Sequence, residues 1–300
     1  LKDVAVYMEQ NSIVDSKEFR RLEFSSSPEI YDNSLQAWFK DMTNYDLSLM
    51  HFLFGAGAEM ANELGIKTEA AHWNKLKSQL PDFDLDNEGS LTFAKGFPYN
   101  ASHRHFSHAL AIHPLGIIDW SDGEKAQRII RATLKKMNDY GPDYCTGYTY
   151  SWFANMQARA FNGEEAAKAL RTFAECFCLK NTFHANGDQS ASGKSKFTYR
   201  PFTLEGNFAF AAGIHEMLLQ SHTGVIRVFP AVPESWKNVS FNNLRAMGGF
   251  LVSAALKDGK VVRLEIYAEK GGRLAVFSPF EHKVVEYDTQ PGSRIDLAVE

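Results

Sequence analysis

The spacing of apolar residues is helical from the start of the chain to about residue 222. Apolar side chains recur every three or four positions, which places them on one face of a helix. Residues 46–64 show this pattern and end at Gly65, and residues 68–80 stop at Pro81, where a helix cannot continue. About seven helices are predicted, several of them paired through short turns or long polar loops: 46–64, 68–80, 103–113, 122–137, 148–161, 164–178 and 208–219.

After Gly224 the pattern changes to short alternating or β-branched runs separated by glycine and proline. The predicted strands are 225–229, 250–256, 260–268, 273–277, 283–287 and 294–299. Asp258-Gly259 between two of them is a strong hairpin signal. We therefore predict a helical domain over 1–222 and an antiparallel β-sandwich over 223–300, with 223–237 as the linker.

Composition places the protein among ordinary globular proteins. The chain has 300 residues, of which 44% are hydrophobic and 23% charged, so it can bury a substantial core. Its net charge is -4 and it has no cluster of Lys and Arg, which argues against a nucleic-acid partner. No apolar run is long enough for a membrane span. The three cysteines, Cys145, Cys176 and Cys178, have the spacing of neither a disulfide framework nor a zinc site.

Long polar loops precede several of the predicted helices, at 22–44, 82–102, 140–147 and 180–207. Loops longer than about 12 to 15 residues inside a compact domain are usually functional. We expect these four loops to gather at one end of the helices and to carry the chemistry of the protein.

Glu29 is the first candidate catalytic residue. Hydrolysis of a glycosidic bond needs one carboxyl group to protonate the departing oxygen and a second group to attack or to activate water. Glu29 follows Pro28, and Tyr31, Trp38 and Phe39 are close enough in sequence to exclude water and raise its pKa, as an acid requires. Taken alone, a glutamate in an exposed loop is usually only solvated.

Glu205 is the second candidate, at the entry of the helix predicted from Phe208. Asn207 is a suitable cap for that helix. The positive end of the helix dipole would keep the Glu205 carboxylate ionised, which suits a base. The alternative is a helix cap and a first-turn acid without chemistry.

A dense cluster of imidazole and guanidinium groups runs from His103 to His108. Arg104 and His105 are suited to donate hydrogen bonds to sugar hydroxyls, and His103, Asn207 and Trp152 complete the candidate substrate-binding set. A metal site at the histidines is disfavoured because no HExxH motif or partner carboxylate accompanies them, so neither a metal nor a cofactor is expected. Trp152 is either a core residue or a ring on which a sugar stacks.

Other chemistries lack their motifs. The chain has no GxSxG elbow and no glycine-rich phosphate loop before a helix, which sets aside nucleophilic-serine and nucleotide chemistry.

The order of several motifs resembles glycoside hydrolase family 95 over residues 22–260. The motifs are Ser27-Pro28-Glu29, the segment from His103 to His108, Thr146-Gly147-Tyr148 with Trp152 and Ala158-Arg159, Glu205-Gly206-Asn207-Phe208, residues 213–222, residues 229–233 with Trp236, and residues 244–250. The resemblance implies part of an (α/α)6 helical barrel followed by an antiparallel β-sandwich. It also implies an inverting α-L-fucosidase acting on terminal fucose of oligosaccharides or glycans, or an α-L-galactosidase on the same scaffold.

The resemblance also assigns roles to individual residues. Glu29 matches the general acid of the family, Arg104 and His105 match residues that contact the sugar, and Glu205 matches an acidic residue that helps to activate water. The family usually has Asp at the position of Glu205, and the extra methylene shifts the carboxylate. A non-catalytic carbohydrate-binding fragment is therefore a second alternative.

The resemblance covers only the later part of the family's catalytic domain. The N-terminal β-domain, the first barrel helices and the asparagines that hold the attacking water are expected before Leu1. Seven helices cannot close a ring of twelve, and an open ring would expose a large apolar face. We expect a missing N-terminal half, a companion chain or a second copy to complete the barrel. The resemblance further implies a bacterial protein that is secreted or periplasmic.

Overall fold

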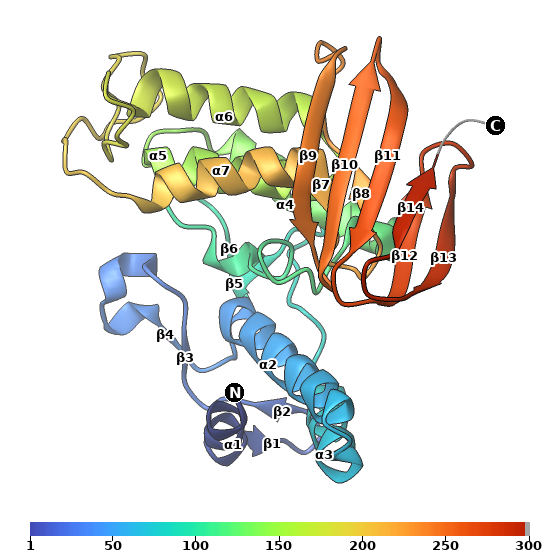
Figure 1. The fold of residues 1–300 in the computed structure, drawn as a ribbon. Helices are drawn as coiled ribbons and strands as arrows, with labels where there is room; N and C mark the ends of the chain where they lie inside the picture. The colour runs from blue at the N-terminus through green and yellow to red at the C-terminus, as the bar shows by residue number, and fades with distance from the viewer. Residues whose placement is uncertain (298–300) are drawn as a thin grey trace. The chain divides into compact units, whose positions relative to one another are not determined.

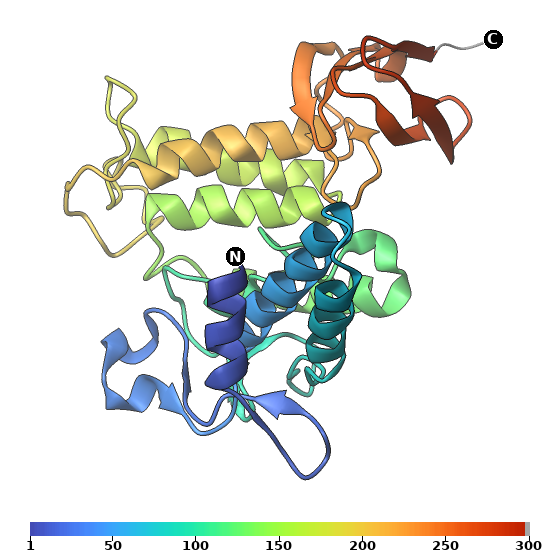
Figure 2. The ribbon, with the colours of Figure 1, turned by 60° about the horizontal axis from the view of Figure 1, so that its bottom comes forward.

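The computed structural model describes residues 1–297, and its chain divides into two units, Leu1–Pro142 and a second that begins at Asp143. Helices occur in both units, and the second also carries a series of antiparallel strands (Figures 1 and 2). The prediction of a helical part followed by an antiparallel β part is confirmed. The (α/α)6 barrel and the boundary between residues 222 and 223 stay predictions.

The first unit contains four α-helices joined by long segments with 3-10 turns and short ladders. The helices are α1 (Lys2–Gln10), α2 (Asn44–Glu63), α3 (Lys67–Ser78) and α4 (Glu124–Asp139), and the 3-10 turns are η1 (Ile30–Asn33), η2 (Leu35–Ala37), η3 (Ser107–Ala109) and η4 (Trp120–Asp122). The ladders pair β1 (Ile13–Val14) with β2 (Arg20–Arg21), β3 (Ser25–Ser26) with β4 (Trp38–Phe39), and β5 (Thr92–Ala94) with β6 (Phe97–Pro98).

Helices α2 and α3 form the hairpin predicted from their apolar faces. The Thr43 hydroxyl accepts a hydrogen bond from the backbone N–H of Asp46 and so caps α2. The rings of Phe54 and Trp73 stack across the hairpin with centroids 6.2 Å apart. Ala5 of α1 joins the same buried cluster, so the three helices share one core.

The second unit begins with three helices, α5 (Gly147–Arg159), α6 (Gly163–Phe177) and α7 (Glu205–Leu218). Helix α5 packs against both α6 and α7 (Figure 1). Two polar contacts fix α5 against α7. The amide of Asn155 donates to the carbonyl of Ala209 at 2.8 Å, and the buried guanidinium of Arg159 donates to both carboxylate oxygens of Glu216 at 2.6 and 2.8 Å.

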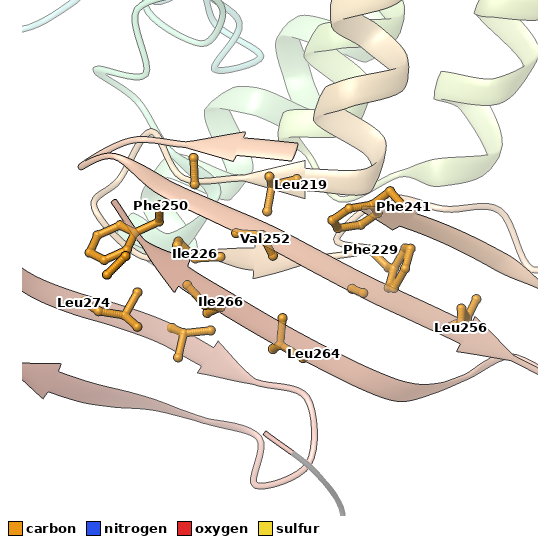
Figure 3. Close-up of a cluster of buried hydrophobic side chains, with 14 residues drawn as sticks. Leu219, Ile226, Phe229, Phe241, Phe250, Val252, Leu256, Leu264, Ile266 and Leu274 are labelled. Carbon is orange, nitrogen blue, oxygen red and sulfur yellow. The ribbon is translucent and has the colours of Figure 1, made fainter. Parts of the chain in front are cut away.

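The β part of this unit has one four-stranded sheet in the order β14-β11-β10-β9 and the two-stranded ladders β12-β13 and β7-β8. The strands are β7 (Leu219–Gln220), β8 (Arg227–Val228), β9 (Val239–Ala246), β10 (Phe250–Lys257), β11 (Lys260–Ala268), β12 (Gly272–Ser278), β13 (Lys283–Thr289) and β14 (Arg294–Leu297). Alternate residues such as Val252, Leu264, Ile266 and Leu274 point into one buried cluster (Figure 3). That cluster draws on β7, β9, β10, β11 and β12, so the sheet and the ladders share a core.

The hairpin prediction at Asp258-Gly259 is confirmed. Lys257 and Lys260 pair across the turn, and the backbone of Asp258 and Gly259 has positive φ angles of 49° and 76°. Both central residues have the φ sign that a type I′ turn requires.

The predicted helix over 103–113 is wrong. Only the single turn η3 forms there, and the ring nitrogen Nδ1 of His103 accepts the backbone N–H of His105 at 3.1 Å. A side chain that binds a nearby backbone group offers that group an alternative to a helical bond. Beyond this turn, the apolar residues Ala111 and Ile112 are buried without being helical.

Other boundaries differ by a few residues or more. The sequence analysis missed α1 and β9, and α7 begins at Glu205 rather than at Phe208. The predicted strand over 225–229 is reduced to Arg227–Val228. The last strand is observed at Arg294–Leu297, and the remainder of the predicted range 294–299 lies outside the described residues. Within the part of the chain that is described, the helices fall short of the length and apolar content needed to cross a membrane.

The β core provides a test of stability. Replacing Leu264, which has an exposed fraction of 0%, by Ala removes packed methyl groups and leaves a cavity. We expect the free energy of unfolding to fall by about 2 to 5 kcal/mol in urea denaturation. Val262 on the same strand is 52% exposed, and Val262→Ala should change it by less than about 0.5 kcal/mol. Equal effects of the two substitutions would contradict this core.

Candidate active site

Glu29 lies in the loop that connects β3 and β4, immediately before η1. The next three positions of the loop, Tyr31, Asp32 and Asn33, have positive φ angles of 50°, 52° and 56°. This conformation is uncommon for residues other than glycine, and a run of three is a local strain that the surrounding contacts must support. The start of the loop is fixed by Ser25, whose hydroxyl donates to the half-buried carboxyl group of Asp46 at 2.5 Å.

The structure brings Glu29 together with Arg104 and His105. The guanidinium Nη2 of Arg104 donates to Oε2 of Glu29 at 2.5 Å, and Nε2 of His105 lies 3.1 Å from the same oxygen. The side chain of Glu29 is 39% exposed, so it is accessible from solvent while Arg104 and His105 remain in contact with it. Three of the predicted site residues from distant parts of the sequence thus form one cluster.

The electrostatics of Glu29 differ from the sequence-based expectation of a raised pKa. Burial raises the pKa of Glu29, but the charge of His105 and the hydrogen bond and charge of Arg104 outweigh it, so the pKa lies below its ordinary value. The aromatic residues expected to exclude water do not all do so, because Tyr31 and Trp38 are largely exposed and only Phe39 is buried. In this arrangement Glu29 is held as a carboxylate.

Two buried serines that the sequence analysis did not select tie the parts of this cluster together. The hydroxyls of Ser27 and Ser107 lie 2.7 Å apart, both in buried residues. Ser27 is two residues before Glu29, and Ser107 is two residues after His105. The Ser-Pro-Glu and histidine motifs each contain one of these serines, which is the signal that was available in the sequence.

The remaining histidines of the cluster have structural contacts. His103 uses Nδ1 for the loop bond described above, and its backbone N–H donates to the hydroxyl of Tyr99. His108 is fully buried between the rings of Phe93 and Tyr99, and burial lowers its pKa to about 3. Among residues 1–297, no group of three or more His, Cys, Asp or Glu side chains is arranged to hold a metal ion.

Glu205 lies in the second unit, where it is exposed in the first turn of α7. Negative charge in that turn interacts favourably with the helix dipole. The Glu205 carboxylate is near Tyr148 of α5, because it adds to the effect of burial in raising the pKa of that tyrosine. The ring of Tyr148 packs against Trp152 with centroids 5.6 Å apart, and Trp152 is buried. Burial of Trp152 favours its core alternative, and Tyr148 is a neighbour of Glu205 that the sequence analysis missed.

Asn207 does not cap a helix beginning at Phe208, because it is already inside α7. The residue before the helix is Leu204, which makes no side-chain cap. The Asn207 amide instead binds the preceding loop: its oxygen accepts the backbone N–H of His184 at 3.1 Å, and its nitrogen donates to the carbonyl of Thr182 at 3.0 Å. Asn207 therefore joins the loop 178–204 to the start of α7.

Glu29, Arg104, His105 and His103 belong to the first unit, and Glu205, Asn207 and Trp152 to the second. Convergence of the two glutamates on one pocket stays a prediction.

Family comparison agrees with these motifs. Residues 1–218 match the model of the glycosyl hydrolase family 95 catalytic domain, and residues 220–296 match that of the glycoside hydrolase family 95 C-terminal domain. The chain belongs to glycoside hydrolase family 95. The family resemblance found in the sequence is thereby confirmed, and the two family models meet near residue 219, between α7 and the strands.

Two curated members of family 95 are similar to the chain. It is 31% identical to "Alpha-L-fucosidase 2" of Arabidopsis thaliana over 232 residues, which cover 75% of the chain and 27% of the relative. It is 23% identical to "Probable alpha-fucosidase A" of Aspergillus niger over 247 residues, which cover 78% of the chain and 28% of the relative. The chain thus spans between a quarter and a third of the length of these curated relatives.

The contact between Arg104 and Glu29 has a measurable consequence. Arg104→Gln removes a fixed positive charge from the carboxylate, so the pKa of Glu29 should rise, as followed by NMR titration of its side-chain carbon. In the unsubstituted protein the contact stabilises the fold above the ordinary pKa of Glu, and this contribution is lost as the pH falls through the lowered pKa. In Arg104→Gln, this loss of folding stability at acid pH should be absent.

A matched control is Arg128→Gln, which removes an exposed cation that pairs with Glu124 on α4. It should leave the titration of Glu29 unchanged. If Glu29 titrates at the same pH in Arg104→Gln as in the unsubstituted protein, the assigned contact does not control its charge.

Proposed function

We propose that the protein is a glycoside hydrolase of the α-L-fucosidase type, which releases terminal α-L-fucose from glycans with inversion at the anomeric carbon. The observation that carries this proposal is the cluster of Glu29, Arg104 and His105 in a chain that belongs to family 95. The names of the two relatives support fucose as the sugar.

Glu29 is proposed as the general acid that protonates the departing glycosidic oxygen. An acid must carry a proton when the substrate is bound, whereas Arg104 and His105 hold Glu29 ionised in the absence of sugar. Arg104 and His105 are also donors suited to sugar hydroxyls. If sugar hydroxyls accept these hydrogen bonds instead, the hydrogen-bond contributions that lower the pKa of Glu29 are lost, and its pKa rises toward the range that an acid needs.

Glu205 is proposed to assist the activation of the attacking water on the opposite face of the sugar. Inverting enzymes keep their two carboxyl groups about 6.5 to 9.5 Å apart to leave room for this water. Exposure of Glu205 at the first turn of α7 leaves its carboxylate accessible. His103, Asn207 and Trp152 stay proposed substrate-binding residues, although all three have structural contacts.

The helical part is proposed to be the C-terminal part of an (α/α)6 barrel followed by a β-sandwich. A missing N-terminal half, a companion chain or a second copy would complete the barrel, since the chain spans less than a third of each relative. Such a missing part would cover apolar side chains that are exposed near the start of α7. These are Phe183, Phe202, Leu204 and Phe208. A secreted or periplasmic bacterial location is proposed from the family resemblance alone.

Turnover by the full-length protein tests the catalytic proposal. With an oligosaccharide that ends in α-L-fucose as substrate, Glu29→Gln should lower kcat by about 10² to 10⁴, because the departing sugar alcohol needs a proton and the amide cannot donate it. Glu124→Gln, at an exposed position of α4, should leave kcat unchanged. Equal activity of Glu29→Gln and the unsubstituted protein would remove Glu29 from the acid role. Sugar binding in calorimetry by a protein that shows no turnover would favour the non-catalytic alternative.

Glu205 provides a separate test of sugar preference. Glu205→Gln should abolish most of the turnover, whereas Glu205→Asp retains the charge and retracts the carboxylate by one methylene, which changes the position of the activated water. We expect Glu205→Asp to alter the ratio of kcat/KM between aryl α-L-fucosides and α-L-galactosides. An unchanged ratio would show that the side-chain length at this position does not set the preference.

A further inference from the structure

We propose that His184 is a positioning residue that fixes Glu205 at the entry of α7 through the hydrogen bonds of its ring and its backbone. This inference rests on the proposed function in that Glu205 is taken as a catalytic carboxylate. Neither the sequence motifs nor the family comparison assigns a role to His184.

His184 lies between the starting residues of two helices. Its side chain is fully buried, and its ring packs against Phe173 of α6 with centroids 5.1 Å apart. A Cβ atom built on Gly147, the first residue of α5, would lie 2.2 Å from Nε2, and one built on Gly206 of α7 would lie 2.4 Å from Nδ1. The imidazole therefore occupies space that only glycine leaves free at both positions.

The hydrogen bonds of the ring identify which nitrogen carries the proton. Nδ1 lies 2.7 Å from the backbone carbonyl of Thr203 and 2.9 Å from the hydroxyl of the same residue. The hydroxyl can donate or accept, but the carbonyl can only accept. Nδ1 is therefore the protonated nitrogen and Nε2 is left as an acceptor. Nε2 is buried and has no hydrogen-bond partner. Leaving a buried acceptor unpaired is unfavourable, so a histidine here is not explained by filling of the core alone.

The bonds of His184 lie on both sides of Glu205. On one side, its Nδ1–H donates to the carbonyl of Thr203, and its own carbonyl accepts the N–H of Thr203 at 3.3 Å. On the other side, its backbone N–H donates to Oδ1 of Asn207 at 3.1 Å. Thr203 and Asn207 each stand two residues from Glu205 in the sequence. One buried residue thus holds the backbone before and after the carboxylate.

His184 acts through these bonds as a neutral ring. Burial lowers its pKa, which outweighs the opposing effects of the Thr203 carbonyl and the Glu205 carboxylate. The neighbouring segments add backbone support, since the N–H of Asn186 donates to the carbonyl of Pro201 at 3.2 Å. Residues 184–186 and residues 201–203, which lead into α7, are therefore joined by hydrogen bonds, and the His184 ring lies at one end of this pairing.

Two substitutions separate the roles of the ring nitrogens. His184→Asn places an amide near Nδ1 and can still donate to the Thr203 carbonyl, whereas His184→Gln places its amide near Nε2 and cannot. In the full-length protein acting on a nitrophenyl α-L-fucoside, we expect His184→Asn to stay within about threefold of the original kcat and His184→Gln to lose about tenfold to a hundredfold, with KM changed less than kcat. His282→Asn, at an exposed turn of the β part, is the matched control and should change neither constant.

Amide hydrogen exchange gives a readout that does not depend on activity. The backbone N–H groups of residues 184 and 203 should exchange faster in His184→Gln than in His184→Asn. Only the asparagine keeps a side-chain hydrogen bond to the carbonyl of Thr203. If the unsubstituted protein has no fucosidase activity but the exchange rates differ in this way, the proposed function fails and the positioning role stands. Equal kcat and equal exchange in the two variants would overturn the positioning role.

A measurement without any substitution keeps the inference testable if His184→Gln does not fold. The nitrogen NMR signals of the His184 ring at neutral pH should show the proton on Nδ1. A proton on Nε2 would mean that the bond to the Thr203 carbonyl is absent, and the inference would be wrong.

Discussion

The candidate site depends on the contact between the Glu29 carboxylate and the side chains of Arg104 and His105, which follow it by 75 and 76 residues. All three residues lie in segments without long regular structure, so neither helix nor sheet alone fixes their positions. The contact between the Ser27 and Ser107 hydroxyls joins the same two segments from inside the core. The buried pair of serines holds the two loops in fixed positions. The side chains of the ionic cluster can therefore stay accessible to solvent and still be well placed.

Polar contacts also hold the backbone at the start of α7, but the groups that make them are different. There the backbone on both sides of Glu205 is held by neutral groups, the His184 ring and the Asn207 amide. Charged partners next to Glu205 would neutralise a carboxylate that is proposed to act as a base, whereas neutral bonds to the flanking backbone leave its charge free. The two carboxylates are thus positioned in different ways, Glu29 by charged and polar side chains that touch it and Glu205 by neutral bonds to its flanking backbone.

Local sequence patterns predicted what depends on neighbours along the chain. The apolar faces of α2, α3, α4 and α6 and the Asp258-Gly259 hairpin needed only periodicity and turn chemistry. The failures occurred where a distant or polar contact decides the outcome. Over residues 103–113 only a single 3-10 turn forms, and the His103 ring accepts the backbone N–H of His105. Asn207 binds Thr182 and His184 instead of capping a helix. The motifs selected Glu29, Arg104 and His105, whose side chains are in contact in the structure, but their spacing could not give the sign of the pKa shift of Glu29.

That sign constrains how the proposed acid works. A carboxyl group whose pKa is lowered by its neighbours is a poor proton donor until those neighbours bind other partners. Under the proposed function, sugar hydroxyls would be these partners, so the binding of substrate and the protonation of Glu29 would be linked, and each would favour the other to the same extent. An empty site then keeps Glu29 ionised and hydrogen-bonded, which avoids an unpaired charge at 39% exposure. The residues that recognise the sugar would in this way also determine when Glu29 carries its proton.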